Sequence, residues 1–248
     1  MKVIASYHLK GGVGKTATTV NLAYLLAEQG ARTLVWDLDP QGATSFYFRV
    51  KPKVKGGVQG LLESRKALLR SIRGTDYEGL DLLPADFRAR HIDVDLDHAG
   101  KPRRRVGEVL KSLRRDYDIV LIDCPPSIGL ASESVFRAAD ALLVPIIPTT
   151  LSLNSLAQLA GHIEGLRRAP AIWPFFSMVD ARKSLHREVC DTAPSLPYRF
   201  LSARIPYSSH VERMGVRRAP LPAYAPSSGA SRAYRALLDE IIQRVREQ

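Results

Sequence analysis

Two patterns of apolar residues alternate along the chain. The first is a short apolar run, which is typical of a strand buried on both faces. Such runs predict strands at residues 2–7, 32–37, 80–84, 118–123, 141–147 and 171–178. The second pattern places apolar residues at helical spacing and predicts helices at residues 16–28, 104–115, 132–138, 152–167 and 230–246. Because strands and helices alternate, we expect an α/β fold with a mostly parallel sheet and helices on both faces.

The segments between these elements carry their own signals. Residues 51–57 form a basic stretch with two glycines, which predicts a loop. Residues 219–229 contain three prolines, so we expect them not to be helical. No internal repeat and no domain-sized linker interrupts the pattern, and 248 residues is an ordinary size for an α/β domain. The sequence therefore predicts a single domain over residues 1–248.

Composition narrows the class of protein. With 45% hydrophobic and 25% charged residues the chain is typical of a globular domain. It has no apolar run long enough for a transmembrane helix and no signal-peptide layout at its start. Cys124 and Cys190 lack the spacing of a metal site and are expected to be reduced. These features predict a cytoplasmic protein.

A glycine-rich loop follows the first predicted strand and precedes the first predicted helix. It reads Lys10-Gly11-Gly12-Val13-Gly14-Lys15-Thr16 and ends like a phosphate-binding loop, although Leu9 replaces the expected first glycine. Glycines let backbone N–H groups approach an anion, and the helix N-terminus adds partial positive charge. Lys15 would reach the β- and γ-phosphates of a nucleotide, and the Thr16 hydroxyl would bind magnesium. We therefore expect the fold of a P-loop NTPase.

Three acidic residues follow the ends of predicted strands, where ligands gather in an open α/β sheet. Asp37 and Asp39 lie in Asp-Leu-Asp-Pro-Gln-Gly, and Asp123 ends a clear buried strand. Asp123 is placed to hold hydrated magnesium near the phosphates. Asp39, on a loop past its strand, is placed to orient the attacking water. A single acid here would be read as a helix cap or turn residue, but three at one edge favour a functional site.

These motifs resemble those of the ParA/MinD ATPases. The loop at residues 10–16 resembles their deviant Walker A loop, residues 37–42 resemble switch I, and residues 123–127 resemble switch II. Residues 139–145, 151–153 and 226–234 also match the family pattern, so the likeness runs in order along nearly the whole chain. It is strongest to the short ParA type, as in Soj, which lacks an N-terminal helix-turn-helix region.

The resemblance implies ATP and Mg²⁺ as cofactors. Backbone and side chains of the loop would bind the nucleotide, namely Lys10, Gly11, Gly12, Val13, Gly14, Lys15, Thr16 and Ala17. The family's extra lysine, here Lys10, is expected to cross a dimer interface to the partner's nucleotide, so that ATP holds the homodimer together and hydrolysis loosens it. Asp39 would help to activate water, Thr16 and Asp123 would serve magnesium, and Pro206 and Ser208 would lie near the adenine.

The chain departs from the family after residue 205. ParA proteins often carry Pro-Arg-Asn where this chain has Pro206-Tyr207-Ser208, so the base-contacting asparagine and a DNA-binding arginine are replaced. The net charge of +11 nevertheless favours a polyanionic partner. Basic residues cluster at 101–115 and 213–218, where they form either solvated helix faces or contacts to DNA phosphates. We expect non-specific DNA binding and a nucleoid location.

The resemblance also implies a cargo. In the ParA class this is a chromosome or plasmid bound by a ParB-like adaptor that accelerates hydrolysis. The alternatives are a positioning ATPase for a protein cargo, such as a chemoreceptor cluster or microcompartment, a MinD-like membrane regulator, or a metabolic amidoligase-type enzyme. The apolar face of the last predicted helix is read as a core-packing face, so no membrane partner is expected.

Overall fold

The computed structural model describes residues 1–51, 61, 64–85 and 102–247. Within these residues one eight-stranded sheet has the order β3-β4-β2-β5-β1-β6-β7-β8. All neighbouring strands are parallel except β3 and β4. The strands are β1 (Lys2–Ser6), β2 (Thr33–Asp37), β3 (Arg73–Gly74), β4 (Leu80–Leu83), β5 (Ile119–Asp123), β6 (Ala141–Ile146), β7 (Ala171–Val179) and β8 (Arg204–Pro206).

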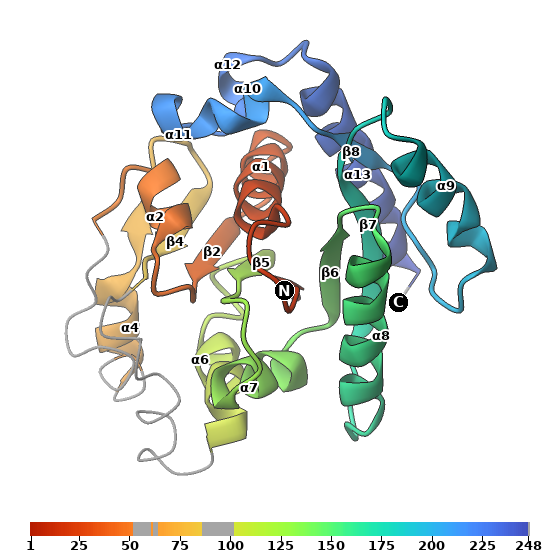
Figure 1. The fold of residues 1–248 in the computed structure, drawn as a ribbon. Helices are drawn as coiled ribbons and strands as arrows, with labels where there is room; N and C mark the ends of the chain where they lie inside the picture. The colour runs from red at the N-terminus through yellow and green to blue at the C-terminus, as the bar shows by residue number, and fades with distance from the viewer. Residues whose placement is uncertain (52–60, 62–63, 86–101, 248) are drawn as a thin grey trace.

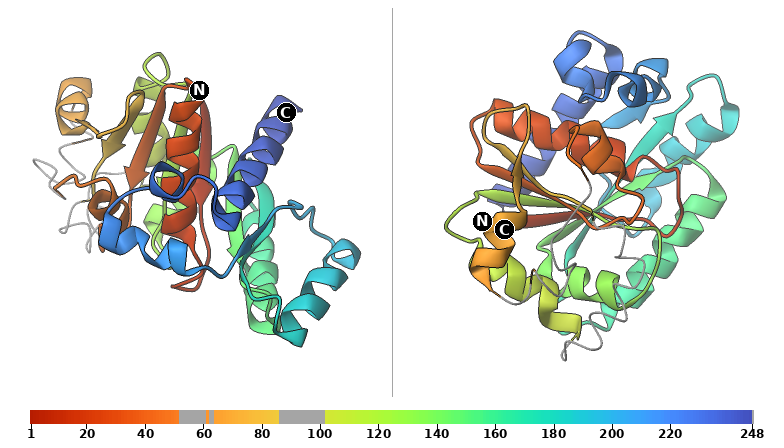
Figure 2. Two further views of the ribbon diagram at one scale, coloured as in Figure 1. Left: turned by 90° about the horizontal axis from the view of Figure 1, so that it is seen from above. Right: turned by 90° about the vertical axis from the view of Figure 1, so that its left-hand side faces the viewer.

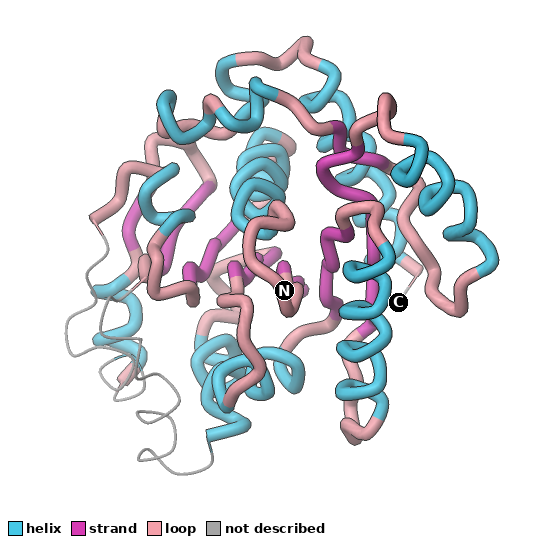
Figure 3. The backbone as a smooth tube through the Cα atoms, viewed as in Figure 1, coloured by secondary structure: helices cyan, strands magenta, loops and turns pink. Residues whose placement is uncertain are grey.

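Helices cover both faces of this sheet (Figure 1). One face is covered by α1 and α13 and the other by α6, α7 and α8. Figure 3 shows the strands in magenta between the helices. The helices are α1 (Lys15–Glu28), α2 (Ala43–Tyr47), α4 (Arg65–Ser71), η2 (Pro102–Arg104), α6 (Arg105–Ser112), α7 (Leu130–Ala138), α8 (Thr150–Glu164), α9 (Ser184–Thr192), η3 (Ala193–Ser195), α10 (Ser209–Glu212), α11 (Met214–Arg217), α12 (Leu221–Tyr224) and α13 (Gly229–Arg246).

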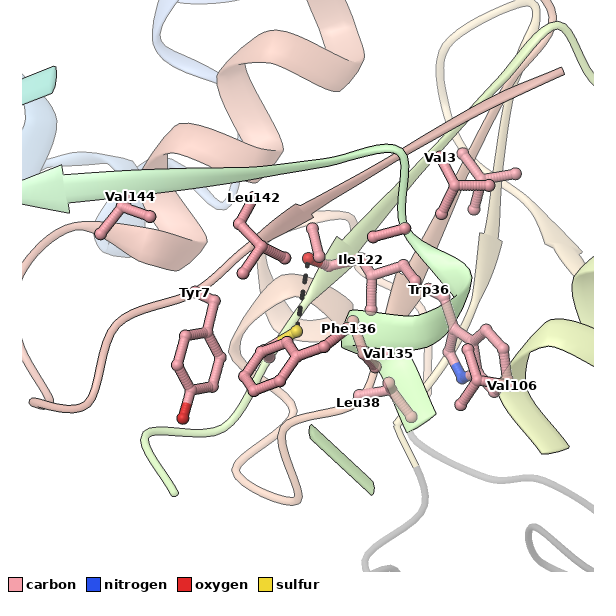
Figure 4. Packing of buried hydrophobic residues seen from close by; sticks show 14 of the residues in the cluster. Val3, Tyr7, Trp36, Leu38, Val106, Ile122, Val135, Phe136, Leu142 and Val144 are labelled. Carbon is pink, nitrogen blue, oxygen red and sulfur yellow. Dashed lines mark hydrogen bonds between the residues drawn. The ribbon is translucent and has the colours of Figure 1, made fainter. Parts of the chain in front are cut away.

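Each face of the sheet has its own hydrophobic cluster. In β5, Val120 and Ile122 belong to the cluster beneath α6, α7 and α8, whereas Ile119 and Leu121 belong to the cluster beneath α1 and α13. This alternation follows from the two-residue period of a strand. Figure 4 shows part of the first cluster, where Tyr7 meets Phe136 edge to face at a centroid distance of 4.8 Å. Burial on both faces explains why the strands read as continuous apolar runs.

The predicted fold class is confirmed, and so are the six predicted strands, each within one residue at either end. The five predicted helices are also present, with ends displaced by up to three residues. The sequence did not predict β3, β8, α2, α4, α9, η3, α10 and α11; α9 has nine residues and the others have two to seven.

The expectation that residues 219–229 are not helical is wrong for five of them: Leu221–Tyr224 form α12, and Gly229 begins α13. Pro222 lies in the first turn of α12, where its missing N–H costs nothing. The helix start is fixed by Leu221, whose backbone N–H donates to Asn21 Oδ1 at 2.7 Å. The predicted basic loop at 51–57 lies, beyond Lys51, outside the described residues.

Both termini lie toward the end of the sheet at which the parallel strands begin (Figure 2, left). Along the described ranges, no helix combines the length and the hydropathy that a bilayer crossing requires. Both cysteines are buried and unpaired. The opposite end of the sheet carries the loops that contain the predicted site residues.

Candidate nucleotide-binding site

Three strand ends meet at the centre of the sheet. Ser6 of β1 is the register partner of Asp123 of β5, which is also the register partner of Asp37 of β2. The glycine loop follows Ser6, and the two acidic segments follow Asp37 and Asp123. The structure therefore brings the predicted loop and the predicted acids to one edge, as parallel strands require.

The glycine loop needs glycine at particular positions. Gly12 and Gly14 have φ values of 73° and 100°, in the left-handed region. A Cβ on Gly14 would lie 2.8 Å from Ser177 Oγ, at the end of β7. Gly11 has open space around its Cβ position and no positive φ. The sequence pattern of the loop is thus explained by backbone conformation and by close approach to β7.

Lys15 begins α1 and is buried, with 6% of its surface exposed. Its ammonium donates to the carbonyl oxygen of Lys10 at 3.2 Å. Burial lowers the pKa of Lys15, and the nearby charges of Asp123 and Asp39 oppose this shift. A buried ammonium that donates to a neutral carbonyl suits an incoming phosphate, which would bring negative charge to it.

Asp123 is fully buried and collects two hydroxyl groups. Its Oδ2 accepts hydrogen bonds from Thr16 Oγ1 and Thr44 Oγ1, both at 2.8 Å, whereas its Oδ1 has no partner. Burial raises the pKa of Asp123. A carboxylate with a free buried oxygen, next to a threonine hydroxyl, is a donor set of the kind that magnesium takes beside nucleotide phosphates. The residues present therefore fit Mg²⁺, and Thr44 is a member of this group that sequence analysis missed.

Asp37 fixes the start of α2 rather than facing the loop. Its Oδ2 accepts from the backbone N–H and the hydroxyl of Ser45 at 2.8 and 2.7 Å, and its Oδ1 has no partner. Burial raises the pKa of Asp37, and the nearby charge of Asp123 adds to the shift. The Ser45 hydroxyl also accepts from the Ala85 N–H at 3.0 Å. Asp37 thus ties the switch I segment to the end of β4.

Asp39 faces a cavity of about 600 Å³ together with the glycine loop. Its Oδ1 accepts from the backbone N–H of Gln41 at 2.9 Å, which orients the carboxylate. The cavity lining also includes Pro206 and Ser208, the two residues expected to lie near the adenine. The other lining residues come mainly from strand ends and short helices and are Gly11, Gly12, Gly14, Lys15, Thr16, Ala17, Gln41, Ala43, Tyr47, Pro126, Ser177, Met178, Ile205, Tyr207, Val211, Glu212 and Tyr234.

Three predicted residues, Lys10, Val13 and Asp123, do not line this cavity. Asp123 is fully buried and accepts a hydrogen bond from Thr16, which does line it. Val13 is buried in the core, with 2% of its surface exposed. Lys10 points instead to the start of α8, where its ammonium donates to the Leu151 carbonyl at 3.3 Å. The backbone N–H of Lys10 donates to His8 Nδ1 at 2.9 Å. Lys10 is therefore held away from the cavity of its own chain.

Tyr207 and Ser208, in the segment that replaces Pro-Arg-Asn, make hydrogen bonds to residues close by in the sequence. The Tyr207 hydroxyl donates to Glu212 Oε1 at 2.6 Å, and Ser208 Oγ accepts from the His210 N–H at 3.2 Å as the cap of α10. Sequence analysis also missed Ser177 and Met178, although they occupy a strand end like the predicted acids. Met178 has a positive φ of 55°, and no sequence pattern predicts this conformation for a methionine.

A parallel sheet with a glycine loop at a helix N-terminus, a buried lysine and two strand-end aspartates defines a P-loop nucleotide-binding protein. A family model described as an AAA domain matches residues 1–172. The chain is 31% identical to the chromosome partitioning protein ParA of Caulobacter vibrioides over 100% of this chain and 96% of that protein. It is 30% identical to the sporulation initiation inhibitor protein Soj of Bacillus subtilis over 97% and 98%. The chain belongs to the ParA/MinD family of ATPases.

A solved structure shares this fold. Cobyrinic acid a,c-diamide synthase of Mycobacterium smegmatis, with bound ADP and magnesium, superposes with a TM-score of 0.82 at 27% identity, over 99% of this chain and 95% of that one. The predicted family and fold are thus confirmed.

Proposed function

We propose that this protein is an ATPase that dimerises with ATP, binds DNA without sequence preference and releases it after hydrolysis. The observation that carries the proposal is the group formed by the buried Lys15 and Asp123 and the half-buried Thr16, beside a cavity that Asp39 also lines. The full-length likeness to partitioning proteins supports the same conclusion.

In this proposal the glycine loop binds the phosphates and Lys15 neutralises the β- and γ-oxygens. Thr16 and Asp123 would hold Mg²⁺, which neutralises charge that develops on the phosphate oxygens. The Thr16 hydroxyl would then release Asp123 Oδ2, to which it donates at 2.8 Å. Asp39 would hold the attacking water, and Pro206 and Ser208 would flank the base.

Lys10 would complete the site of a second copy. Its ammonium donates a hydrogen bond to an exposed carbonyl at the start of α8. A bond of this kind at the surface contributes little, so the side chain is free to reach across an interface when a second nucleotide brings negative charge opposite it. ATP would then stabilise a homodimer, and loss of the γ-phosphate would weaken it.

The proposed cellular role is positioning of a chromosome or plasmid. A ParB-like adaptor on that cargo would accelerate hydrolysis, and the ATPase would act in the cytoplasm on the nucleoid. A protein cargo requires the same switch with a different adaptor. A MinD-like membrane role would require an apolar surface to insert, whereas Tyr234, Leu237, Leu238 and Ile241 of α13 are buried against the sheet.

A second candidate is an ATP-dependent ligase, favoured by the structural likeness to a diamide synthase. A ligase would turn over ATP only with a carboxylic acid substrate and an amine source. A partitioning ATPase would turn it over with DNA and an adaptor. Steady-state ATP hydrolysis with each set of additions separates the two.

The deciding experiment measures binding to a random-sequence duplex with ATP and with ADP, at 50 and at 200 mM salt. An Asp39→Ala variant holds the ATP state. Tight, salt-sensitive binding with ATP alone is expected, because phosphate contacts release counterions. Absence of binding in both states would overturn the DNA part of the proposal and leave a protein or membrane scaffold to be tested.

A further inference from the structure

A second hollow lies far from the nucleotide site. Its volume is about 380 Å³, and it is formed by η2, the first turn of α6, the end of α7 and the connection from α8 to β7. Figure 1 shows α6 and α7 side by side beneath the sheet, with the end of α8 beside them. We call this hollow the arginine basin; its lining residues are Arg103, Arg104, Gly107, Ser134, Arg137, Ala138, Arg167 and Arg168.

Small residues form the floor of the basin. Gly107 has no side chain, and a Cβ placed there would lie 3.7 Å from Ala138 Cβ, so α6 and α7 pack closely at this point. The Ser134 hydroxyl accepts from the Val106 N–H at 3.0 Å and is buried. The floor therefore presents few polar groups to a ligand. The guanidinium groups around it determine which ligands the basin attracts.

Among the described residues, three of the five arginines have no carboxylate partner. Arg103 pairs with Glu133, and Arg168 lies 3.5 Å from Asp140. Within the part of the chain that the structure describes, Arg104, Arg137 and Arg167 make no ion pair and no side-chain hydrogen bond. Five guanidiniums and two carboxylates leave a net charge of three around one hollow, which favours a bound anion.

The basin and the nucleotide cavity lie at opposite ends of the sheet. Arg167 and Arg168 precede the first residue of β7, whereas Ser177 and Met178 at the other end of β7 line the nucleotide cavity. Eight steps along a strand span about 26 Å. A nucleotide in the cavity therefore cannot occupy the basin, and the basin needs a ligand of its own.

We propose that the arginine basin binds phosphate groups of the DNA backbone. Guanidinium groups match phosphate oxygens in geometry and charge. All five side chains are exposed, and the buried Ser134 is already hydrogen-bonded. A small-molecule site uses a few converging polar groups in a mostly apolar cavity, whereas DNA phosphates need only exposed cations.

The choice of DNA as the source of phosphate rests on the proposed function.

The test compares two triple variants in the Asp39→Ala background with ATP. The basin variant carries Arg104→Gln, Arg137→Gln and Arg167→Gln, which remove charge and retain most of each aliphatic stem. The control carries Lys66→Gln, Arg70→Gln and Arg246→Gln, which are equally exposed and also lack a carboxylate partner among the described residues. DNA affinity is measured by fluorescence anisotropy from 50 to 200 mM salt.

The basin variant is expected to lose about tenfold or more in affinity, and its slope of log affinity against log salt should fall by about two to three, since each phosphate contact contributes about 0.9. The control should change by less than about threefold. Equal losses in both variants would mean that general charge, not the basin, attracts DNA, and would overturn the proposal.

A second experiment distinguishes DNA phosphates from the phosphates of a free small molecule. Calorimetry with inorganic tripolyphosphate is carried out with the nucleotide site filled by ATP. If the basin variant loses tripolyphosphate binding but keeps DNA affinity, the ligand is a free phosphorylated molecule and the DNA assignment is wrong. If the parent binds no DNA in either nucleotide state, the proposed function fails. Equal tripolyphosphate binding by parent and basin variant would then overturn the basin as an anion site as well.

Discussion

Asp37 and Asp123 are register partners on adjacent strands, and each has one carboxylate oxygen that is buried without a hydrogen-bond partner. Burial raises the pKa of both carboxyl groups, and the nearby charge of Asp123 raises the pKa of Asp37 further. Ionising two neighbouring buried carboxyl groups lowers the stability of the folded state. A bound metal ion with its nucleotide would offset this loss, which is why such a pair is typical of a functional site.

This pair makes stability depend on pH. In the unfolded chain an aspartate ionises near pH 3.9, whereas a raised pKa keeps Asp37 protonated to higher pH in the folded state. Between these two values the folded state binds more protons, so the free energy of unfolding falls as pH rises above about 4. The contribution is therefore fully present at low pH and is lost toward and beyond neutral pH.

Asp37→Asn should remove the contribution of Asp37 to this dependence, while Asp123 still titrates and the acceptor for Ser45 is kept. In the absence of nucleotide and metal, the parent is expected to lose about 1–3 kcal/mol relative to the variant between pH 5 and pH 8. Urea unfolding at the two pH values measures the difference. Asp76→Asn, at an exposed position, is the control that should retain the parent's slope. A parent and Asp37→Asn variant with parallel pH profiles would refute the raised pKa.

Lys15→Ala should abolish nucleotide binding. Loss of a buried ammonium that would neutralise two phosphates is expected to lower ATP affinity by about a hundredfold or more, since charged hydrogen bonds contribute about 1.5–3 kcal/mol each. Titration calorimetry gives the affinity, and Lys66→Ala on the exposed face of α4 controls for the loss of one positive charge. Retained ATP affinity in Lys15→Ala would show that the loop does not bind phosphate as proposed.

Gly14→Ala should destabilise the loop, and Gly11→Ala should not. At Gly14 a Cβ meets both a φ of 100° and Ser177 Oγ at 2.8 Å, whereas at Gly11 neither constraint applies. The expected cost at Gly14 is about 1–3 kcal/mol in the free energy of unfolding, and Gly11→Ala should stay within about 0.5 kcal/mol. Thermal unfolding of both variants measures this.

A second substitution separates the two causes. Ser177→Ala in the Gly14→Ala background removes the hydroxyl but leaves the left-handed φ. It should therefore recover part of the lost stability and not all of it. Full recovery would mean that the contact with β7 alone requires the glycine, and no recovery would mean that the backbone conformation alone does.

Much of this site was predictable because parallel strands end at one edge of a sheet. That rule places Lys15, Thr16 and Asp123 together from their positions after apolar runs. It would also have found Ser177, had it been applied to the end of the strand at residues 171–178. The position of Thr44 could not be predicted, because α2 has five residues and is too short to show a helical period.

The other omissions have similar physical causes. Three-residue β8 is defined by pairing with β7 rather than by its own sequence. The positive φ of Met178 is imposed by its surroundings, since methionine has no preference for that region. α12 escaped prediction because Pro222 was weighed as a helix breaker and not as a first-turn residue. The arginine basin is assembled from three separate segments of the chain, of which only residues 101–105 form a visible basic run.

Asp39→Ala should separate ATP binding from hydrolysis. The Asp39 carboxylate lines the cavity and is oriented by the Gln41 N–H, so its removal takes away the proposed position of the attacking water. The hydrolysis rate is expected to fall by about 10²–10⁴, with ATP affinity changed only a few fold. Phosphate release in single turnover measures the rate, with Asp76→Ala as a control. A normal rate in the Asp39→Ala variant would remove Asp39 from the mechanism.

Lys10→Ala should separate ATP binding from dimerisation. In the single chain the Lys10 ammonium contacts the Leu151 carbonyl and lines no part of the described nucleotide cavity, so its loss should change ATP affinity by less than about threefold. In the proposed dimer the same ammonium neutralises the partner's nucleotide, and its loss leaves two buried clusters of negative charge opposed.

Sedimentation velocity in the Asp39→Ala background, with and without ATP, distinguishes the two roles. The parent is expected to shift from monomer to dimer on addition of ATP, and Lys10→Ala to remain a monomer. Lys2→Ala, which removes a lysine at the opposite end of β1, is the matched control and should still dimerise. An ATP-dependent dimer of Lys10→Ala would show that the second lysine of the glycine loop acts within its own chain.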